Sequence, residues 1–172
     1  MDTFKEYMIT RRQDSKDKLQ VFALVFLCCL ALAASFLFVQ LIADILGFVM
    51  FAIIAGFYGC FYFASLKRVE YEYIFTNGDL DIDKIMGQKK RKRLATIDMA
   101  TLTQFGKITD EKRREILSSD NTVIDASDNM HTDDDYYLQC KHKNLGMCYL
   151  IFTPSDEFAD ELRPYFPRAL KQ

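Results

Sequence analysis

The chain has 172 residues, of which 27% are charged and 50% are hydrophobic, and its formal net charge is -2. These averages conceal a division, because residues 19–66 contain no Lys, Arg or Glu and Asp44 is their one formal charge. A single soluble globule does not fit, since the remaining residues are too few to cover so long an apolar stretch. The composition instead predicts a membrane anchor and one modest polar domain.

The apolar stretch is long enough for two membrane-spanning helices. A helix rises about 1.5 Å per residue, so about 20 residues cross a hydrocarbon core of about 30 Å. We expect a transmembrane helical hairpin over 19–66, with helices at about 19–41 and 45–66. The alternative is a buried hairpin inside a soluble protein. The polar and turn-forming residues between the two helices are Gln40, Asp44 and Gly47.

Basic residues flank the apolar stretch on both sides. They are Lys5, Arg11, Arg12, Lys16 and Lys18 before it and Lys67 and Arg68 after it. The predicted turn carries none, so the positive-inside rule places both termini in the cytoplasm of a multi-pass protein of the cell (inner or plasma) membrane. A cleaved signal peptide is disfavoured, because its apolar region is shorter and lies nearer the start.

Small residues recur every four positions on the second predicted helix. This face predicts close packing, either against the first helix through Ala31 and Ser35 or against a second copy of the chain. Neither span contains Lys, Arg, His or Glu, which argues against transport by the chain. The small residues are Ala52, Gly56, Cys60 and Ala64.

The segment 1–18 has two interpretations. Phe4, Tyr7 and Met8 share one face of a hypothetical helix, which predicts a short interfacial helix on the cytoplasmic side. The alternative is a solvated tail.

The segment from Val69 alternates apolar and polar residues, which predicts a strand. Asn77-Gly78 is a strong hairpin signal and predicts that Phe75 faces Leu80 and Tyr73 faces Ile82. A second turn at Gly87-Gln88 leads into a third strand at 89–96.

The rest of the chain predicts further strands and one closing helix. A short charged helix or loop at 110–117 precedes a strand at 122–126 and a hairpin of two strands near 136–152. Thr153-Pro154-Ser155-Asp156 predicts a helix start with Thr153 as its cap, and Pro164 should kink or end that helix. The predicted fold class is α+β, with the hairpin followed by a mainly antiparallel β sandwich or barrel over 67–172.

This order of elements resembles the bacterial pleckstrin-homology (PH)-like domains that are attached to transmembrane hairpins. The matching features are the strand end Phe75–Gly78, the basic third strand and the junction Phe152–Ser155. The whole chain is similar to a family of small two-span membrane proteins of Gram-positive anaerobes. The resemblance implies a fold and a location, and no activity or cofactor.

The basic run in the third strand is the main candidate site. Classical PH domains carry phosphoinositide-binding residues at the matching place, so the resemblance implies contact with anionic lipid headgroups. The same basic surface could bind an acidic protein partner instead of lipid. The alternative is a purely structural role, in which Arg91 pairs with Asp83 and Arg93 with Asp81 across the strands. That pairing assumes Ile85 opposite Lys89 and leaves Lys90 and Lys92 as the free contacts. The run is Lys89, Lys90, Arg91, Lys92 and Arg93.

Other chemistry has weaker support. Cys140 and Cys148 fit two core thiols better than a disulfide, because the predicted compartment is reducing. The residues His131, Asp133–Asp135 and His142 match no metal signature, and hydrolase and phosphate-loop motifs are absent. Residues 67–172 carry 17 Lys and Arg against 19 Asp and Glu, which disfavours nucleic acid.

These patterns predict a noncatalytic membrane adaptor or accessory protein without a cofactor or metal, whose cytoplasmic domain contacts another membrane protein. A module that senses anionic lipid through the basic strand is the alternative. An enzyme acting on a membrane substrate is a second alternative, for which the residues offer no site.

Overall fold

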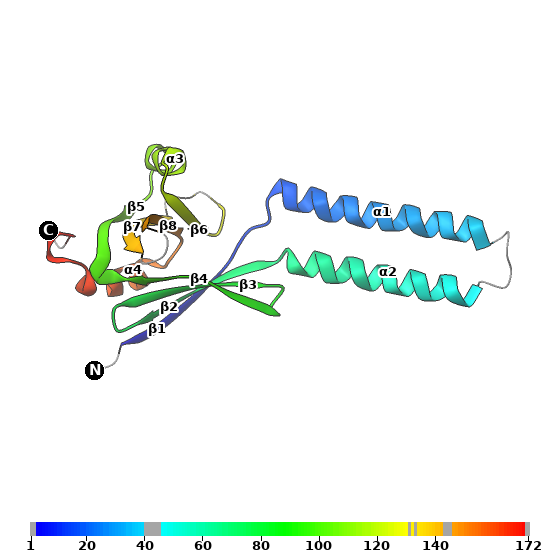
Figure 1. Ribbon diagram of the computed structural model, residues 1–172, viewed down its shortest axis with the longest axis horizontal. Coiled ribbons are helices and arrows are strands. Elements are labelled where there is room, and N and C mark those ends of the chain that lie inside the picture. Colours follow the sequence, from blue (N-terminus) through cyan, green and yellow to red (C-terminus); the bar gives the residue numbers. More distant parts are fainter. Residues whose placement is uncertain (1–2, 40–45, 131, 133, 143–145, 171–172) are drawn as a thin grey trace. The chain divides into compact units, whose positions relative to one another are not determined.

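The computed structural model describes residues 3–39, 46–130, 132, 134–142 and 146–170 (Figure 1). The side chains of 35–39, 46–50 and 52 lie outside that description. The chain forms two compact units: residues 13–68, and residues 1–12 together with 69–172. Below, these are called the helical unit and the β unit.

The helical unit contains α1 (Ser15–Val39) and α2 (Leu46–Leu66). The first helix begins at Ser15, earlier than predicted, directly after Asp14, whose side chain accepts a hydrogen bond from Ser15 N at 2.7 Å. Among the described residues, Ser15–Ala34 is the one helical segment long and apolar enough to cross a membrane, and a shorter apolar segment covers Ile53–Leu66. The predicted turn at 40–45 lies outside the described residues.

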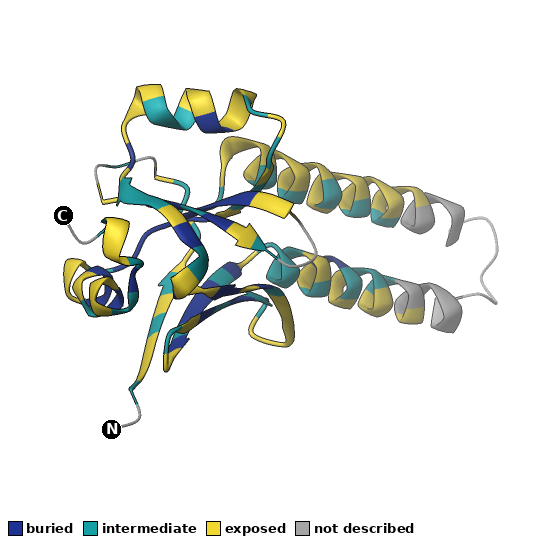
Figure 2. Cartoon of the chain, turned by 60° about the vertical axis from the view of Figure 1, so that its left-hand side comes forward, coloured by how far each residue is buried: buried dark blue, intermediate teal, exposed yellow. Residues whose placement is uncertain are grey.

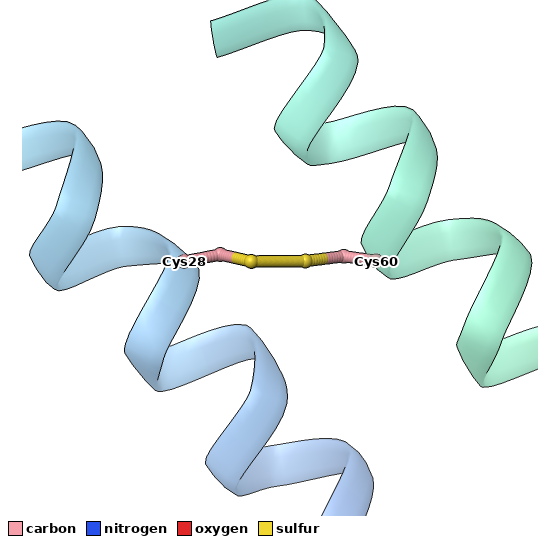
Figure 3. The surroundings of a disulfide bond; sticks show 2 residues. All are labelled: Cys28 and Cys60. Atoms are coloured by element: carbon pink, nitrogen blue, oxygen red, sulfur yellow. A yellow bond between two sulfur atoms is a disulfide. The ribbon is translucent and has the colours of Figure 1, made fainter. Parts of the chain in front are cut away.

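The two helices are joined by a disulfide between Cys28 and Cys60 (Figure 3). The start of α1 and the end of α2 are also in contact. Lys67 Nζ lies 2.5 Å from Gln20 Oε1 and 3.4 Å from Asp17 Oδ1. Sequence reasoning places Cys60 on the packing face but does not foresee its bond to Cys28. That bond requires a particular rotation of each helix, which spacing within one helix does not define.

The predicted small-residue face is only partly described. Cys60 is buried, whereas Gly56 and Ala64 are half-buried and the side chain of Ala52 is outside the described set. Apart from its chain neighbours and the nearby backbone of α2, no described residue has an atom within 4 Å of the position that a Cβ would take at Gly56. The described contact therefore lies at Cys60, and a close approach at Gly56 is not seen.

The β unit consists of two four-stranded sheets. Sheet A has the order β1-β2-β3-β4, and sheet B has the order β5-β7-β8-β6. All neighbouring pairs are antiparallel except β6 and β8, so the predicted mainly antiparallel α+β fold is confirmed. The strands are β1 (Phe4–Thr10), β2 (Val69–Thr76), β3 (Asp79–Met86), β4 (Lys90–Asp98), β5 (Leu102–Lys107), β6 (Thr122–Ala126), β7 (Tyr136–His142) and β8 (Gly146–Phe152).

The first strand corrects the prediction for the N-terminal segment, because Phe4–Thr10 form neither an interfacial helix nor a solvated tail. β1 pairs along its whole length with β2, and Tyr7 lies opposite Tyr73 with ring centroids 6.1 Å apart. Tyr7 and Ile9 are half-buried, while Phe4 and Met8 are exposed. The sequence does not show this alternation, because Tyr7, Met8 and Ile9 are consecutive apolar residues, and the partner strand is separated from β1 by both helices.

The first hairpin of sheet A has the predicted register. Phe75 lies opposite Leu80 and Tyr73 opposite Ile82. The turn works because Asn77 and Gly78 both take positive φ angles, 50° and 104°, as a two-residue hairpin turn requires.

The second hairpin turns at Gly87 as predicted, but its register differs. Ile85 lies opposite Arg91 rather than Lys89, because the loop is longer than two residues and Met86 pairs with Lys90. An irregularity at Ile82/Asp83 then shifts the register again.

Sheet B and two short helices complete the β unit. The strand at 122–126 is confirmed as β6, and the charged segment forms α3 (Asp110–Ser118), capped by Thr109. The closing helix α4 (Asp156–Leu162) is capped by Ser155 rather than Thr153. It ends before Pro164, as predicted, and a 3-10 turn follows at Arg163–Tyr165.

The core lies between the two sheets and α4. Figure 2 shows buried residues concentrated on the strands, whereas the described parts of α1 and α2 are mostly exposed. Tyr73 is central, since its ring contacts those of Tyr7, Phe152 and Phe158. The largest fully buried side chains include Tyr73, Phe75, Leu80, Ile82, Ile97, Leu138, Leu150, Phe152 and Leu162.

The pairing of β1 with β2 yields a prediction about domain boundaries. Residues 69–172 alone leave the edge of β2 and one side of the Tyr73 ring uncovered. We expect residues 1–12, joined to 69–172 by a short glycine–serine linker, to be more stable than 69–172 alone by about 2 kcal/mol or more. Urea unfolding followed by circular dichroism measures the difference, and equal midpoints would contradict this role of β1.

Candidate functional site

The basic run forms the start of β4, where its side chains alternate between two faces of sheet A. Arg91 and Arg93 share one face, and Lys90 and Lys92 share the other. All four side chains are exposed. The run therefore divides into two sets with different surroundings.

The arginines neutralise carboxylates of sheet A. Arg91 forms ion pairs with Glu72 and, at 3.5 Å, with Asp83. Arg93 pairs with Asp83 and, at 2.5 Å, with Asp81. Glu72 and Asp83 are 3% and 2% exposed, so each would be costly without a cation beside it. The predicted ion pairs are present although the strand register differs.

The lysines have a different environment. Lys92 lies directly opposite Lys84, and Lys90 opposite Met86. Lys84, Lys90 and Lys92 have no ion pair among the described residues. Like charges placed directly opposite each other destabilise a sheet. Lys84 and Lys92 therefore lower the stability of this basic end of sheet A, whereas Arg91 and Arg93 raise the stability of the sheet.

The basic end coincides with the connections to the helical unit. Val69, where the chain returns from the helices, lies opposite Met86, which in turn lies opposite Lys90. Arg11 N donates a hydrogen bond to Val69 O at 2.8 Å, so the departing chain leaves at this end too. Lys84, Lys90 and Lys92 therefore lie at the end of sheet A where the chain leaves for the helical unit and returns from it.

The arginines and the lysines of β4 are expected to differ in how much their substitution changes stability. Arg93→Met leaves Asp83 buried without its hydrogen-bonded partner, so we expect unfolding free energy to fall by about 1–3 kcal/mol. Lys92→Met, a matched control on the same strand, should change it by less than about 0.5 kcal/mol. Chemical denaturation of the linked domain compares the two variants, and an unchanged stability of Arg93→Met would contradict the structural role.

A buried polar cluster contains Asp135, one of the residues considered above as possible metal ligands. Asp135 is fully buried, pairs with Arg113 and accepts a hydrogen bond from Thr153 Oγ1 at 2.6 Å. Burial raises the pKa of the Asp135 carboxyl, while Thr153 and Arg113 oppose that shift. His131 and Asp133 lie outside the described residues, within which no group of three metal-ligating side chains occurs. Asp135 thus has a structural role.

Tyr73 belongs to the same cluster. Its hydroxyl donates to Ala126 O at 2.6 Å and accepts from Thr153 N at 3.2 Å. Burial raises the pKa of this hydroxyl. One phenol thereby links β2 to the ends of β6 and β8.

Removal of that hydroxyl leaves two buried backbone groups without partners. We expect Tyr73→Phe to lower the free energy of unfolding by about 1–3 kcal/mol. Tyr7→Phe, on the neighbouring strand, is the control and should have little effect, because Tyr7 is half-exposed. Thermal or urea unfolding tests this, and equal stabilities would show that the buried groups find other partners.

Cys140 and Cys148 are confirmed as core thiols. Both are buried and free, they lie opposite each other on β7 and β8, and their sulfur atoms are 3.2 Å apart. The hydrogen bond to Cys148, together with burial, raises the pKa of the Cys140 thiol. Such a thiol is a poor nucleophile.

A groove that sequence reasoning missed runs beside β5, an edge strand of sheet B. Figure 1 shows β5 near the C-terminal segment, and the groove between them has a volume of about 630 Å³. Phe105, Tyr136 and Phe166 line it, with the Phe105 ring 4.7 Å from that of Phe166. These residues come from three elements, so no local pattern in the sequence brings them together.

Charged residues border the groove. Lys107 Nζ lies 5.4 Å from the centroid of the Tyr136 ring and 3.2 Å from Asp156 Oδ1. Hydrogen bonds from Tyr136 and Lys107 lower the pKa of Asp156. Arg163 pairs with Asp160 at 2.9 Å. The groove therefore has an aromatic floor and a mixed, solvent-exposed rim, which suits recognition of a peptide better than catalysis.

Comparison with known proteins adds a family. A family model described as a bacterial PH-like domain (DUF6106) matches residues 1–172. Comparisons with curated proteins and with solved structures found no match. The match covers both units, including the strand that precedes the helices.

Proposed function

Because the chain belongs to the bacterial PH-like domain family, we propose that it is a noncatalytic membrane adaptor that presents its β unit to a protein partner. The groove beside β5 carries this proposal. The helical unit is the anchor, and both termini face the cytoplasm.

The anchor is supported by composition and by the topology of sheet A. The segment Ser15–Ala34 is apolar and no part of its most apolar window is buried. Pairing of β1 with β2 requires residues 12 and 69 to be on the same side of a membrane. A single crossing would separate these strands, so α1 and α2 must both cross if either does. The basic flanks then favour the cytoplasmic side.

Protein contact is supported by features that accept an extended or apolar partner. An edge strand such as β5 offers backbone groups for strand addition, and an adjacent groove can take alternate side chains of the added strand. Phe4 and Met8 are 61% and 51% exposed on β1, the edge strand of sheet A. As an edge strand, β1 also presents backbone groups with which an added strand can pair.

Site-specific crosslinking in cells tests the adaptor function. A photoreactive amino acid at Lys107 or Arg163, on the rim of the groove, should yield an adduct with the same protein. Leu117 on α3 is 61% exposed and serves as the control position, where we expect no adduct. Absence of protein adducts at both rim positions, or equal adducts at Leu117, would count against the proposal.

Contact with anionic lipid is the second candidate function. It is favoured by Lys84, Lys90 and Lys92, which form no ion pair with any described residue and lie at the end of sheet A that carries both connections to the helical unit. Each basic side chain held near an anionic surface contributes about 1 kcal/mol. Arg91 and Arg93 would contribute less, since they neutralise carboxylates of the sheet.

A further inference from the structure

A second cavity lies within the helical unit, at the end where its polypeptide chain enters and leaves. It is a groove between α1 and α2 with a volume of about 270 Å³. Its lining is formed by Gln13, Val21, Phe61, Ala64, Ser65 and Arg68. The groove belongs to neither surface of the β unit described above.

The lining of this anchor groove changes from polar to apolar along the helices. Gln13 precedes α1 and Arg68 follows α2, so these two polar residues lie at the same end of the unit. Val21 is six residues into α1, or about 9 Å along its axis. With Phe61 and Ala64 it gives the groove an apolar wall beyond the polar end. A phospholipid likewise changes from a polar headgroup to apolar acyl chains along its length.

The polar end carries cations without acidic partners. Arg68 is exposed and forms no ion pair among the described residues, and the same holds for Lys16 and Lys18. The nearby acids have other partners, because Asp17 pairs with Lys67 and Asp14 accepts a hydrogen bond from Ser15 N. The surplus charge at this end is therefore positive.

We infer that the anchor groove binds one anionic phospholipid, with its phosphate at Arg68 and an acyl chain against Val21 and Phe61. This inference rests on the proposed membrane anchor. A guanidinium binds phosphate through two parallel hydrogen bonds, and basic pockets between membrane helices are suited to anionic headgroups. Ser65 hydroxyl donates to Tyr62 O at 2.7 Å, which leaves its oxygen to accept from a headgroup hydroxyl, as in phosphatidylglycerol.

Native mass spectrometry of the full chain, released from nanodiscs containing phosphatidylglycerol and phosphatidylcholine, tests the site. We expect a one-to-one adduct with phosphatidylglycerol and a loss of its affinity by about tenfold in Arg68→Ala, equivalent to about 1.4 kcal/mol. Arg68→Lys should retain part of the affinity. Val21→Trp, which fills the groove and keeps the cation, should also lose the adduct.

The matched control removes basic residues elsewhere. Lys90→Ala with Lys92→Ala should keep the adduct, because these lysines lie on sheet A. Equal binding of phosphatidylcholine, or full affinity in both Arg68→Ala and Val21→Trp, would overturn the inference. Loss of the adduct in the Lys90 and Lys92 variant alone would assign binding to the basic end of sheet A and would also overturn it.

Alkaline carbonate extraction of cell membranes separates this inference from the proposed function. Retention of the chain in the membrane pellet without a selective lipid adduct would overturn the lipid site and leave the anchor intact. Release of the chain into the supernatant would overturn both.

Discussion

The pairing of β1 with β2 is the contact on which the rest of the molecule depends. These adjacent strands are separated in sequence by the entire helical unit, so the helices form an insertion within sheet A. The pairing covers Tyr73, whose ring and hydroxyl connect both sheets. It also constrains the helical unit, because the two ends of the insertion must meet at one end of one sheet.

Sheet A separates its charges by the alternation of its strands. On one face, arginines of β4 neutralise carboxylates that are almost fully buried. On the other, Lys92 lies opposite Lys84, and neither forms an ion pair with a described carboxylate. The first arrangement stabilises the fold and the second does not, so a basic run that looks uniform in the sequence contains two kinds of residue. Among the described residues of sheet A, Lys84, Lys90 and Lys92 form no ion pair, whereas Arg91 and Arg93 do.

Local signals were sufficient for much of the fold. Asn77-Gly78 predicts the first hairpin and its register because a two-residue turn leaves no other alignment. The register predicted for the second hairpin is wrong, because the loop after Met86 is longer than two residues and the pairing is irregular at Ile82/Asp83. Interactions between distant segments could not be predicted: β1 needs a partner beyond two helices, and the groove beside β5 combines residues from three elements. The basic run was predictable, but its division depends on where Glu72 and Asp83 lie.

The insertion of the helices within sheet A sets an order for biosynthesis. β1 is made first, yet its partner emerges from the ribosome only after both helices have been synthesised. Throughout that interval β1 is an unpaired strand with Phe4 and Met8 beside Tyr7, a segment prone to nonspecific association. Sheet A can close only after β2 has been synthesised and has reached β1. If the helical unit is the membrane anchor proposed above, a complete sheet A shows that β1 and β2 lie on the same side of the membrane, and a chain inserted in any other way keeps an unpaired strand edge.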